Sequence, residues 1–278
     1  MNLKEALDFG TKRLQSRQIL RPRLESEILL SFVLNQPRIY LHIHETQALS
    51  HFEEIRYLDF ICRREQHEPI EYLTEKVSFY GEEFYISHGA LIPRPETEIL
   101  IDKAKEIILQ HSCKNIAEIG IGSGIISIML SLLLQDYPLK FYASDISPES
   151  LFNAYVNLKK FKISNLKLYK SAFLDFNTQN KLSFDLLISN PPYIKNDEIL
   201  PHSLSYEPSK ALFGGEVGDE ILHQIILLAY NAKIPHLICE MGYNQRQSIE
   251  NFIHKIPHKK IEFYKDLANL DRGFIVEF

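Results

Sequence analysis

The sequence predicts an α/β fold in which a doubly wound, mostly parallel sheet follows a small helical domain. Five apolar runs between residues 115 and 240 alternate with helical stretches, which is typical of parallel strands joined by right-handed crossover helices. Residues 1 to about 65 show only helical spacing of apolar side chains. With 278 residues, 45% of them hydrophobic and 24% charged, the chain is long enough for one large globular domain and a small one.

The amino-terminal region is predicted to be helical. Apolar side chains recur at helical spacing in two stretches, which predicts two helices there. Arg63 and Arg64, near the end of the second stretch, suit the negative end of the helix dipole. The apolar positions are Leu24, Ile28, Leu29, Phe32 and Val33 in the first stretch and Phe52, Ile55, Leu58 and Ile61 in the second.

Residues 76–90 change to the strand period and predict a hairpin that turns near Gly81. The predicted organisation is therefore a helical domain over residues 1–75, a hairpin and linker over 76–95, and an α/β domain over 96–278.

The linker leads stiffly into a helix that is expected to run to about Ile108. Pro93 and Pro95 hold the chain extended, and Thr97 or Glu98 can satisfy the first free N–H groups of the helix. Arg94 lies between the two prolines and has little freedom. It either presents its charge to a site or only braces the linker.

The predicted sheet has seven strands. The last two form a pair joined by a loop, so the final strand is expected to enter antiparallel. The five parallel strands are predicted over Asn115–Ile119, Lys140–Ser144, Leu166–Lys170, Phe184–Ser189 and His236–Glu240, and the last two over Lys260–Tyr264 and Gly273–Phe278.

The first run ends in a glycine-rich loop, Glu118-Ile119-Gly120-Ile121-Gly122-Ser123-Gly124. Glycines let the backbone turn tightly and let a ligand approach the amino end of the next helix. The dinucleotide fingerprint GxGxxG does not fit, because its third glycine would fall on Ile125 or Ser127. The spacing favours a ligand without a pyrophosphate, so S-adenosylmethionine (SAM) fits better than NAD.

Asp145 closes the second run. An acidic side chain at that strand end can bind both ribose hydroxyls of an adenosine. The alternative is that Asp145 caps the next helix, but Ser147, Pro148 and Glu149 already provide the cap, the proline and the acid in the expected order. We therefore favour the ribose role.

Asn190-Pro191-Pro192-Tyr193 follows directly on the fourth run, where two prolines prevent the strand from continuing. An amide side chain beside a rigid, partly donor-free backbone makes a fixed frame for a planar NH2 group, such as a carboxamide or the exocyclic amine of a base. The same residues also fit a strand-ending turn in which Asn190 bonds its own backbone.

Topology brings this segment and the glycine loop together. The first and fourth strands of a doubly wound sheet are neighbours at the switch point, and ligands bind outside their carboxyl ends. The two motifs should face each other across one crevice. A methyl donor on one side and an NH2 frame on the other define amine or amide methylation.

Together these motifs resemble the SAM-dependent methyltransferases that act on planar nitrogen. The segment Leu91–Glu98 is similar to the linker signature of the PrmC/HemK family of glutamine methyltransferases, and the resemblance covers nearly the whole chain, the helical region included. The other matching segments are Tyr206-Glu207-Pro208, Ala211-Leu212, Gly214-Gly215, Cys239–Gln245 and Asp271-Arg272.

The resemblance implies a Rossmann-like methyltransferase domain that methylates N5 of the glutamine in the Gly-Gly-Gln motif of class I peptide chain release factors. SAM would be the methyl donor and S-adenosylhomocysteine (SAH) the product, and the helical domain would dock the partner. The implied SAM-binding residues are Glu118, Gly120, Ile121, Gly122, Ser123, Gly124, Asp145, Phe173 and Asn190; the implied substrate-binding residues are Asn190, Pro191, Pro192, Tyr193 and Arg94.

The predicted chemistry centres on Asn190 to Tyr193. The Asn190 side-chain oxygen and the Pro191 carbonyl would accept the two amide hydrogens, Tyr193 would wall the amide, and Pro192 would hold the turn. Three positions depart from the family pattern: Ala172 stands where an acid is frequent, Thr74 where glycine is usual, and Glu118 where Asp is frequent.

Three alternatives remain open. The nearest is a glutamine methyltransferase for a large-subunit ribosomal protein, which would use the same catalytic parts. A DNA adenine N6-methyltransferase would need a basic, aromatic recognition region, which the charge-neutral first 70 residues lack. A non-enzymatic module that binds SAM or a release factor would have no need of the Asn190 frame.

Composition limits the remaining classes. Net charge is −5, and the ten basic and ten acidic side chains of residues 1–70 cancel, so no direct nucleic-acid partner is expected. Cys62, Cys113 and Cys239 have no metal-site spacing, which predicts free thiols and no metal. With no signal pattern and no apolar run of membrane-spanning length, we expect a cytoplasmic protein without membrane contact.

Overall fold

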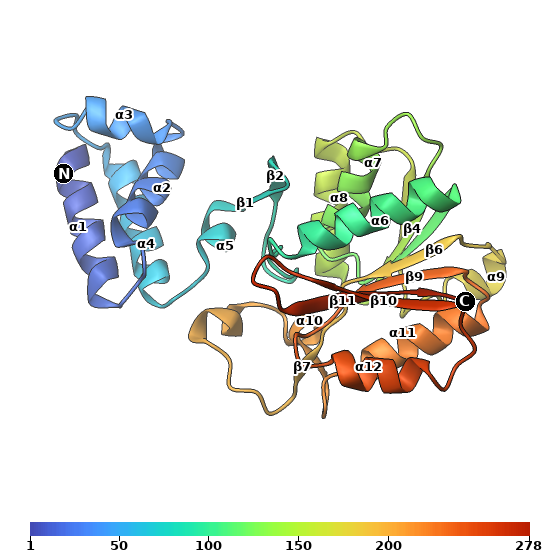
Figure 1. The fold of residues 1–278 in the computed structure, drawn as a ribbon. Coiled ribbons are helices and arrows are strands. Elements are labelled where there is room, and N and C mark those ends of the chain that lie inside the picture. The colour runs from blue at the N-terminus through green and yellow to red at the C-terminus, as the bar shows by residue number, and fades with distance from the viewer. The chain divides into compact units, whose positions relative to one another are not determined.

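The chain folds into two compact units. The computed structural model describes residues 1–278, apart from the side chains at positions 179 and 180. The helical unit comprises residues 1–76 with 201–206, and the sheet unit comprises residues 77–200 with 207–278 (Figure 1). The hairpin belongs to the sheet unit and is not a separate linker, because Tyr85 N donates to Asn157 Oδ1 at 2.7 Å and the Phe84 and Phe161 rings lie 4.7 Å apart.

The helical unit has its own apolar core, formed by side chains such as Leu7, Leu30 and Ile61. The two predicted helices are confirmed as α2 and α4. A capping box between Asn2 and Glu5 starts α1, and a second capping box between Ser50 and Glu53 starts α4. The helices are α1 (Leu3–Ser16), α2 (Pro22–Leu34), α3 (Arg38–Ile43), α4 (His51–Glu65) and α5 (Ile70–Thr74), joined in this unit by the 3-10 helix η1 (His202–Tyr206).

The buried face of α4 differs from the apolar stripe seen in the sequence. Tyr57, Phe60 and Ile61 are buried, whereas Phe52 and Ile55 are 69% and 53% exposed. Helical spacing identifies the helix, but α4 carries two apolar stripes, and only packing decides which one is covered.

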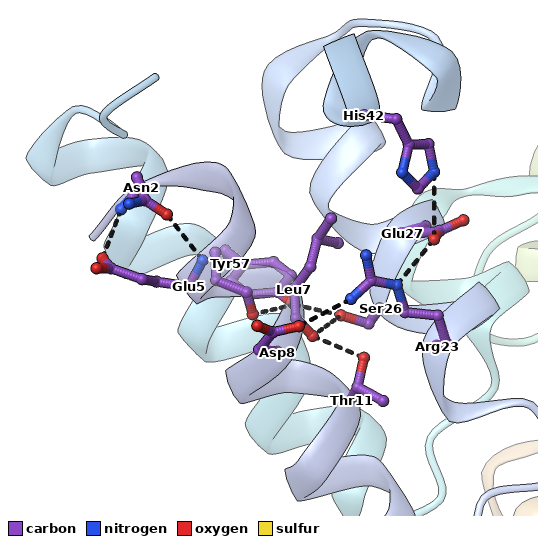
Figure 2. Close-up of polar contacts among 11 residues, drawn as sticks. Asn2, Glu5, Leu7, Asp8, Thr11, Arg23, Ser26, Glu27, His42 and Tyr57 are labelled. Carbon is purple, nitrogen blue, oxygen red and sulfur yellow. Dashed lines mark hydrogen bonds and ion pairs between the residues drawn. The ribbon is translucent and has the colours of Figure 1, made fainter. Parts of the chain in front are cut away.

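Partly buried ion pairs connect segments of this unit. Arg63 and Arg64 do lie in the last turn of α4, but they also pair with Glu68 at 2.6 Å and with Glu25 at 2.5 Å. Figure 2 shows Glu27 of α2 between Arg23 of the same helix and His42 of α3.

The sheet unit contains a seven-stranded sheet in the order β10-β11-β9-β6-β3-β4-β5. All neighbouring pairs from β9 to β5 are parallel, and β11 is antiparallel to both β9 and β10, so the predicted fold class is confirmed. The strands are β3 (Asn115–Ile119), β4 (Lys140–Asp145), β5 (Leu166–Lys170), β6 (Leu186–Ser189), β9 (His236–Glu240), β10 (Lys260–Lys265) and β11 (Asp271–Glu277).

Helices cover both faces of this sheet, with α6, α7 and α8 on one face and α11 and α12 on the other (Figure 1). Because both faces are covered, the residues of β6 and β9 are all buried, which explains their continuous apolar runs. The helices are α6 (Thr97–His111), α7 (Ile125–Leu133), α8 (Pro148–Lys160), α9 (Asn177–Asn180), α10 (Ser209–Leu212), α11 (Glu220–Asn231) and α12 (Arg246–Ile253).

Two short strand pairs complete the fold. The predicted hairpin is confirmed as β1 (Lys76–Phe79) and β2 (Glu82–Tyr85), and β7 (Ile194–Lys195) pairs in parallel with β8 (Phe213–Gly215). No helix among the described residues is long and apolar enough to cross a bilayer.

The predicted start of α6 is corrected in one respect. The helix begins at Thr97, but no side chain caps it. The Thr97 hydroxyl donates to Glu240 Oε2 at 2.7 Å, and Glu98 Oε1 accepts from Tyr80 N at 2.7 Å. Both side chains therefore connect α6 to other elements rather than to its own backbone.

Candidate active site

The glycine loop turns sharply between β3 and α7. Gly120 and Gly122 have φ angles of +74° and +54°, in the left-handed region that glycine adopts without steric cost. The N–H groups of Gly120 and Ile121 donate to Ser144 O at 2.9 and 3.1 Å, which joins the loop to the end of β4. A Cβ added to Gly122 would meet no atom within 4 Å, so that side of the loop is open to a ligand.

Asp145 lies at the carboxyl end of β4, beside this loop. Its Oδ2 accepts from Gly122 N at 3.0 Å and its Oδ1 accepts from Ser147 N at 2.9 Å. Burial raises the pKa of Asp145, while these backbone N–H groups oppose the rise. Ser147 Oγ, and not Asp145, caps α8 by accepting from Ser150 N at 3.1 Å. Asp145 is thus held at the strand end with no capping role.

Asn190 belongs to a line of buried polar groups behind the end of β6. Its Nδ2 donates to Thr97 Oγ1 at 3.2 Å, and the Thr97 hydroxyl in turn donates to Glu240. The Tyr193 hydroxyl donates to the other Glu240 oxygen at 3.0 Å. The amide of Asn190 is therefore hydrogen-bonded to a side chain of α6, and not to its own backbone as in a simple turn.

One cavity of about 490 Å³ joins the two motifs. This volume is in the range of small-molecule sites. Because β3 and β6 are parallel neighbours, their carboxyl ends open on the same edge of the sheet. Ten of the predicted site residues line the cavity: Arg94, Gly120, Ile121, Gly122, Ser123, Asp145, Phe173, Asn190, Pro191 and Pro192.

Comparison with known proteins identifies the family. The model of the PrmC N-terminal domain matches residues 5–74, and that of the methyltransferase small domain matches residues 97–205. A release factor glutamine methyltransferase of Dictyoglomus turgidum is 40% identical over 229 residues, covering 81% of this chain and 80% of the relative. One of Koribacter versatilis is 34% identical over 269 residues, covering 92% and 90%.

The chain belongs to the release factor glutamine methyltransferase family. It is therefore a methyltransferase, and the cavity between the glycine loop and Asn190 is its candidate active site. Among solved structures, the amino-terminal domain of human METTL16 in complex with SAH has a TM-score of 0.55 and 16% identity, covering 90% of this chain and 94% of that one. At this identity the likeness bears on the fold alone.

Three predicted site residues of this family member lie outside the cavity lining. Gly124 ends the loop at the start of α7, and Tyr193 points its hydroxyl at Glu240. Glu118 is 1% exposed and lies behind the loop, where its Oε2 accepts from the Ser127 N–H and hydroxyl. Its other oxygen has no partner among the described residues, and burial raises the pKa of Glu118 to about 8. Glu118 is therefore turned toward α7 and is not part of the cavity lining.

Arg94 both lines the cavity and braces the linker. Its Nη2 pairs with Glu207 Oε1 at 2.5 Å, and Glu207 Oε2 accepts from Ile92 N at 3.0 Å. Glu207, which follows β6 along the chain, thus holds the proline-containing linker at Ile92 and at Arg94. The sequence left open whether Arg94 presents its charge to a site or braces the linker; in the structure it pairs with Glu207 and also borders the cavity.

Phe173 takes a conformation that the sequence does not reveal. Its φ is +43°, which is uncommon for a residue with a side chain, and Ser144 Oγ donates to its carbonyl at 2.5 Å. Phe173 lines the cavity together with Ala172, which adds no acidic group there.

Several residues that shape the site were missed from the sequence. Asn157 of α8 donates to Ser123 O and to Tyr85 O, each at 2.8 Å, so it ties the glycine loop to the hairpin. Asn153, one turn earlier, is also fully buried and accepts from Ser87 N. The sequence feature that could have identified them is the spacing of two asparagines four residues apart on the inner face of a predicted helix. No group of three or more His, Cys, Asp or Glu side chains in the described part of the chain is placed to hold a metal ion.

Proposed function

We propose that this protein transfers the methyl group of SAM to the side-chain nitrogen (N5) of the glutamine in the Gly-Gly-Gln motif of class I peptide chain release factors. The nitrogen gains the methyl carbon as the sulfur–methyl bond breaks, one amide proton leaves to solvent, and SAH is the other product. The identity of 31–40% to release factor glutamine methyltransferases over most of the chain supports this substrate.

One observation carries the proposal: Asn190 and the glycine loop line the same cavity from neighbouring strand ends. A loop suited to a nucleoside ligand and a frame suited to a planar NH2 group therefore face a common space. A module that only bound a ligand would not require the second of these.

The residues of the cavity fit SAM. The carboxylate of Asp145 offers acceptors for ribose hydroxyls, and the open side of Gly122 lets a ligand approach the backbone closely. Ile121, Ile146 and Phe173 supply apolar surface for an adenine ring. When bound, SAM supplies an electrophilic methyl group on a positively charged sulfur.

The task of the protein is to orient a weak nucleophile, because the amide lone pair is delocalised into the carbonyl. The Asn190 Oδ1 and the Pro191 carbonyl accept the two amide hydrogens, which fixes the nitrogen and favours the positive charge that develops on it. Orientation of this kind is worth roughly 7–11 kcal/mol in favourable intramolecular reactions. Pro192 holds the turn that places both acceptors.

The helical unit is proposed to bind the release factor. Its exposed apolar side chains include Ile39, Ile43, Phe52 and Ile55, which are available for a protein partner. Its charges cancel over residues 1–70, which suits a protein better than a nucleic acid. A cytoplasmic location goes with this substrate.

The decisive experiment incubates the protein with labelled SAM and, in separate arms, a class I release factor, large-subunit ribosomal proteins or duplex DNA. Mass spectrometry then locates the label. We expect one methyl group on the Gly-Gly-Gln glutamine of the release factor. Label only on a ribosomal protein or only on DNA, or no label at all, would overturn the assignment.

Asn190→Ala tests the acceptor role directly. We expect kcat at saturating SAM to fall by about a hundredfold or more, because the variant loses an acceptor used in the transition state. Ser131→Ala, which removes a buried hydroxyl of α7 outside the cavity, is the control. Near-normal turnover of Asn190→Ala with SAM bound would exclude the proposed frame.

A further inference from the structure

Asn190 can act as the proposed acceptor only in one of the two orientations of its side-chain amide, with the oxygen toward the substrate. An asparagine side chain carries both an acceptor oxygen and a donor NH2 group, which are nearly the same size. If the amide turned over, it would present a donor to the cavity, and a substrate carboxamide would bind through its oxygen in place of its nitrogen. Something in the protein must therefore select the orientation.

The polar groups behind Asn190 make that selection. Glu240 is 1% exposed, and its two oxygens face the hydroxyls of Thr97 and Tyr193. The ionised carboxylate has no hydrogen to donate, so in that form both hydroxyls donate to it. The Thr97 oxygen, with its hydrogen committed to Glu240, can act only as an acceptor toward Asn190. Nδ2 then turns to Thr97 at 3.2 Å, and Oδ1 faces away from it.

We propose that Thr97 and Glu240 are positioning residues that set the hydrogen-bond polarity of Asn190, and hence make the site accept an NH2 group. This inference rests on the proposed function for its substrate. Within the described part of the chain no group donates to Asn190 Oδ1, which leaves that oxygen for the substrate. Tyr193 supports the same carboxylate from the other side, and Gln245 Nε2 donates to Tyr193 O at 3.0 Å and steadies it.

The polarity requires Glu240 to be ionised. Burial raises the pKa of Glu240, while the hydroxyls of Thr97 and Tyr193 and the charge of Arg272 oppose that rise. Glutamine at position 240 would keep the shape but bring a donor NH2 group. That group can donate to Thr97, whose hydrogen would then be free to donate to Asn190 Oδ1, which reverses the frame.

The test compares Thr97→Val, Thr97→Ser and Glu240→Gln with the parent protein. Valine keeps the shape of threonine without the hydroxyl, whereas serine keeps the hydroxyl. We expect kcat at saturating SAM to fall by about 10- to 100-fold in Thr97→Val and Glu240→Gln, with SAH affinity within about threefold, and to recover most of its value in Thr97→Ser.

A second readout does not depend on turnover. With 15N-labelled asparagine, the side-chain NH2 resonance of Asn190 is assigned by its absence in Asn190→Ala. We expect it to shift in Thr97→Val and Glu240→Gln and to stay in place in Thr97→Ser and in the control Ser131→Ala. Thermal unfolding of each variant identifies any that fail to fold. If Thr97→Val does not fold, Thr97→Ser and Glu240→Gln still decide the test.

The outcomes separate this inference from the proposed function. If the release factor is methylated but Thr97→Val and Glu240→Gln keep parental kcat and an unmoved Asn190 resonance, the positioning role is wrong. If the resonance moves as expected but no release factor is methylated, the positioning role stands and the substrate assignment fails. Equal losses of kcat in Thr97→Ser and Thr97→Val would also overturn the positioning role, since the Thr97 hydroxyl would then not be the feature that matters.

Discussion

Three carboxyl groups lie at or near the carboxyl ends of β3, β4 and β9, and their hydrogen bonds differ in a way that separates their roles. Asp145 accepts from two backbone N–H groups, and Glu240 accepts from two hydroxyls. Glu118 has only Ser127 as a partner, and its Oε1 is buried without one among the described residues. A buried carboxylate with an unsatisfied oxygen is costly, so Glu118 is the group whose charge the fold supports least.

We predict that Glu118 makes the protein less stable as pH rises. Burial raises its pKa from an ordinary 4.5 to about 8. Between these values the folded protein keeps a proton that the unfolded chain has lost, so the free energy of unfolding falls with increasing pH. Its contribution is fully present below about pH 4.5 and is lost as pH rises through about 8. Glu118→Gln should remove this loss, which amounts to a few kcal/mol at roughly 1.4 kcal/mol per pKa unit.

Denaturant unfolding of both proteins from pH 5 to about 8 checks this, and the difference between the two curves isolates Glu118 from other titrating groups. His223 and His236, whose pKa values are lowered by burial, contribute equally to both curves. Parallel stability curves for the two proteins would show that Glu118 keeps an ordinary pKa.

At the scale of elements, the sequence predicts most of the sheet and little of the polar network. The central strands β6 and β9 follow from continuous apolar runs, because strands covered on both faces bury all their residues. The strands β5 and β10 at the two edges of the sheet have one buried residue each, and their runs are correspondingly less apolar. Thr97 and Glu240 are 143 positions apart, and no local pattern states that their side chains meet. The same holds for the buried face of α4, where two apolar stripes compete and only tertiary packing selects one.

The contact between α1 and α4 predicts a change in stability opposite to the one expected from helix propensity. Gly10 of α1 lies against Tyr57 of α4: a Cβ at position 10 would lie 2.0 Å from the Tyr57 hydroxyl and 2.7 Å from Ser26 Oγ. The Tyr57 hydroxyl donates to Ala6 O at 3.0 Å and is hydrogen-bonded to Ser26 Oγ at 2.6 Å. Figure 2 shows Tyr57 and Ser26 beside Leu7. Alanine would gain about 1 kcal/mol in helix propensity.

We expect Gly10→Ala to destabilise the protein by about 2 kcal/mol or more, because overpacking costs about 1–3 kcal/mol and the buried hydrogen bonds of Tyr57 are disturbed as well. Denaturant unfolding measures the loss. Adding Tyr57→Phe removes the nearest of the clashing atoms, so the double variant should be more stable than the sum of the single effects. Simple additivity, or a gain in stability from Gly10→Ala alone, would contradict the packing argument.

For the whole molecule, the division into two units means that the ligand acts directly on only one of them. The cavity is lined entirely by residues of the sheet unit, while the helical unit has its own core. A ligand that binds only the folded state stabilises the unit that holds it, by about 2.7 kcal/mol at a hundred times its Kd. Hydrogen exchange can therefore distinguish the responses of the two units.

We predict that SAH slows amide exchange in the sheet unit, around Gly120–Ser123, Asp145–Ser147 and Ser171–Phe173, and leaves α1, α2 and α4 of the helical unit unchanged. The reason is that these three segments line the cavity, whereas α1, α2 and α4 are held by contacts of their own. Asp145→Ala should abolish the protection at the same SAH concentration, because it removes the proposed ribose acceptor. Equal protection of both units in the parent protein would mean that they open as one cooperative body, and the helical unit would then respond to the cofactor before any partner arrives.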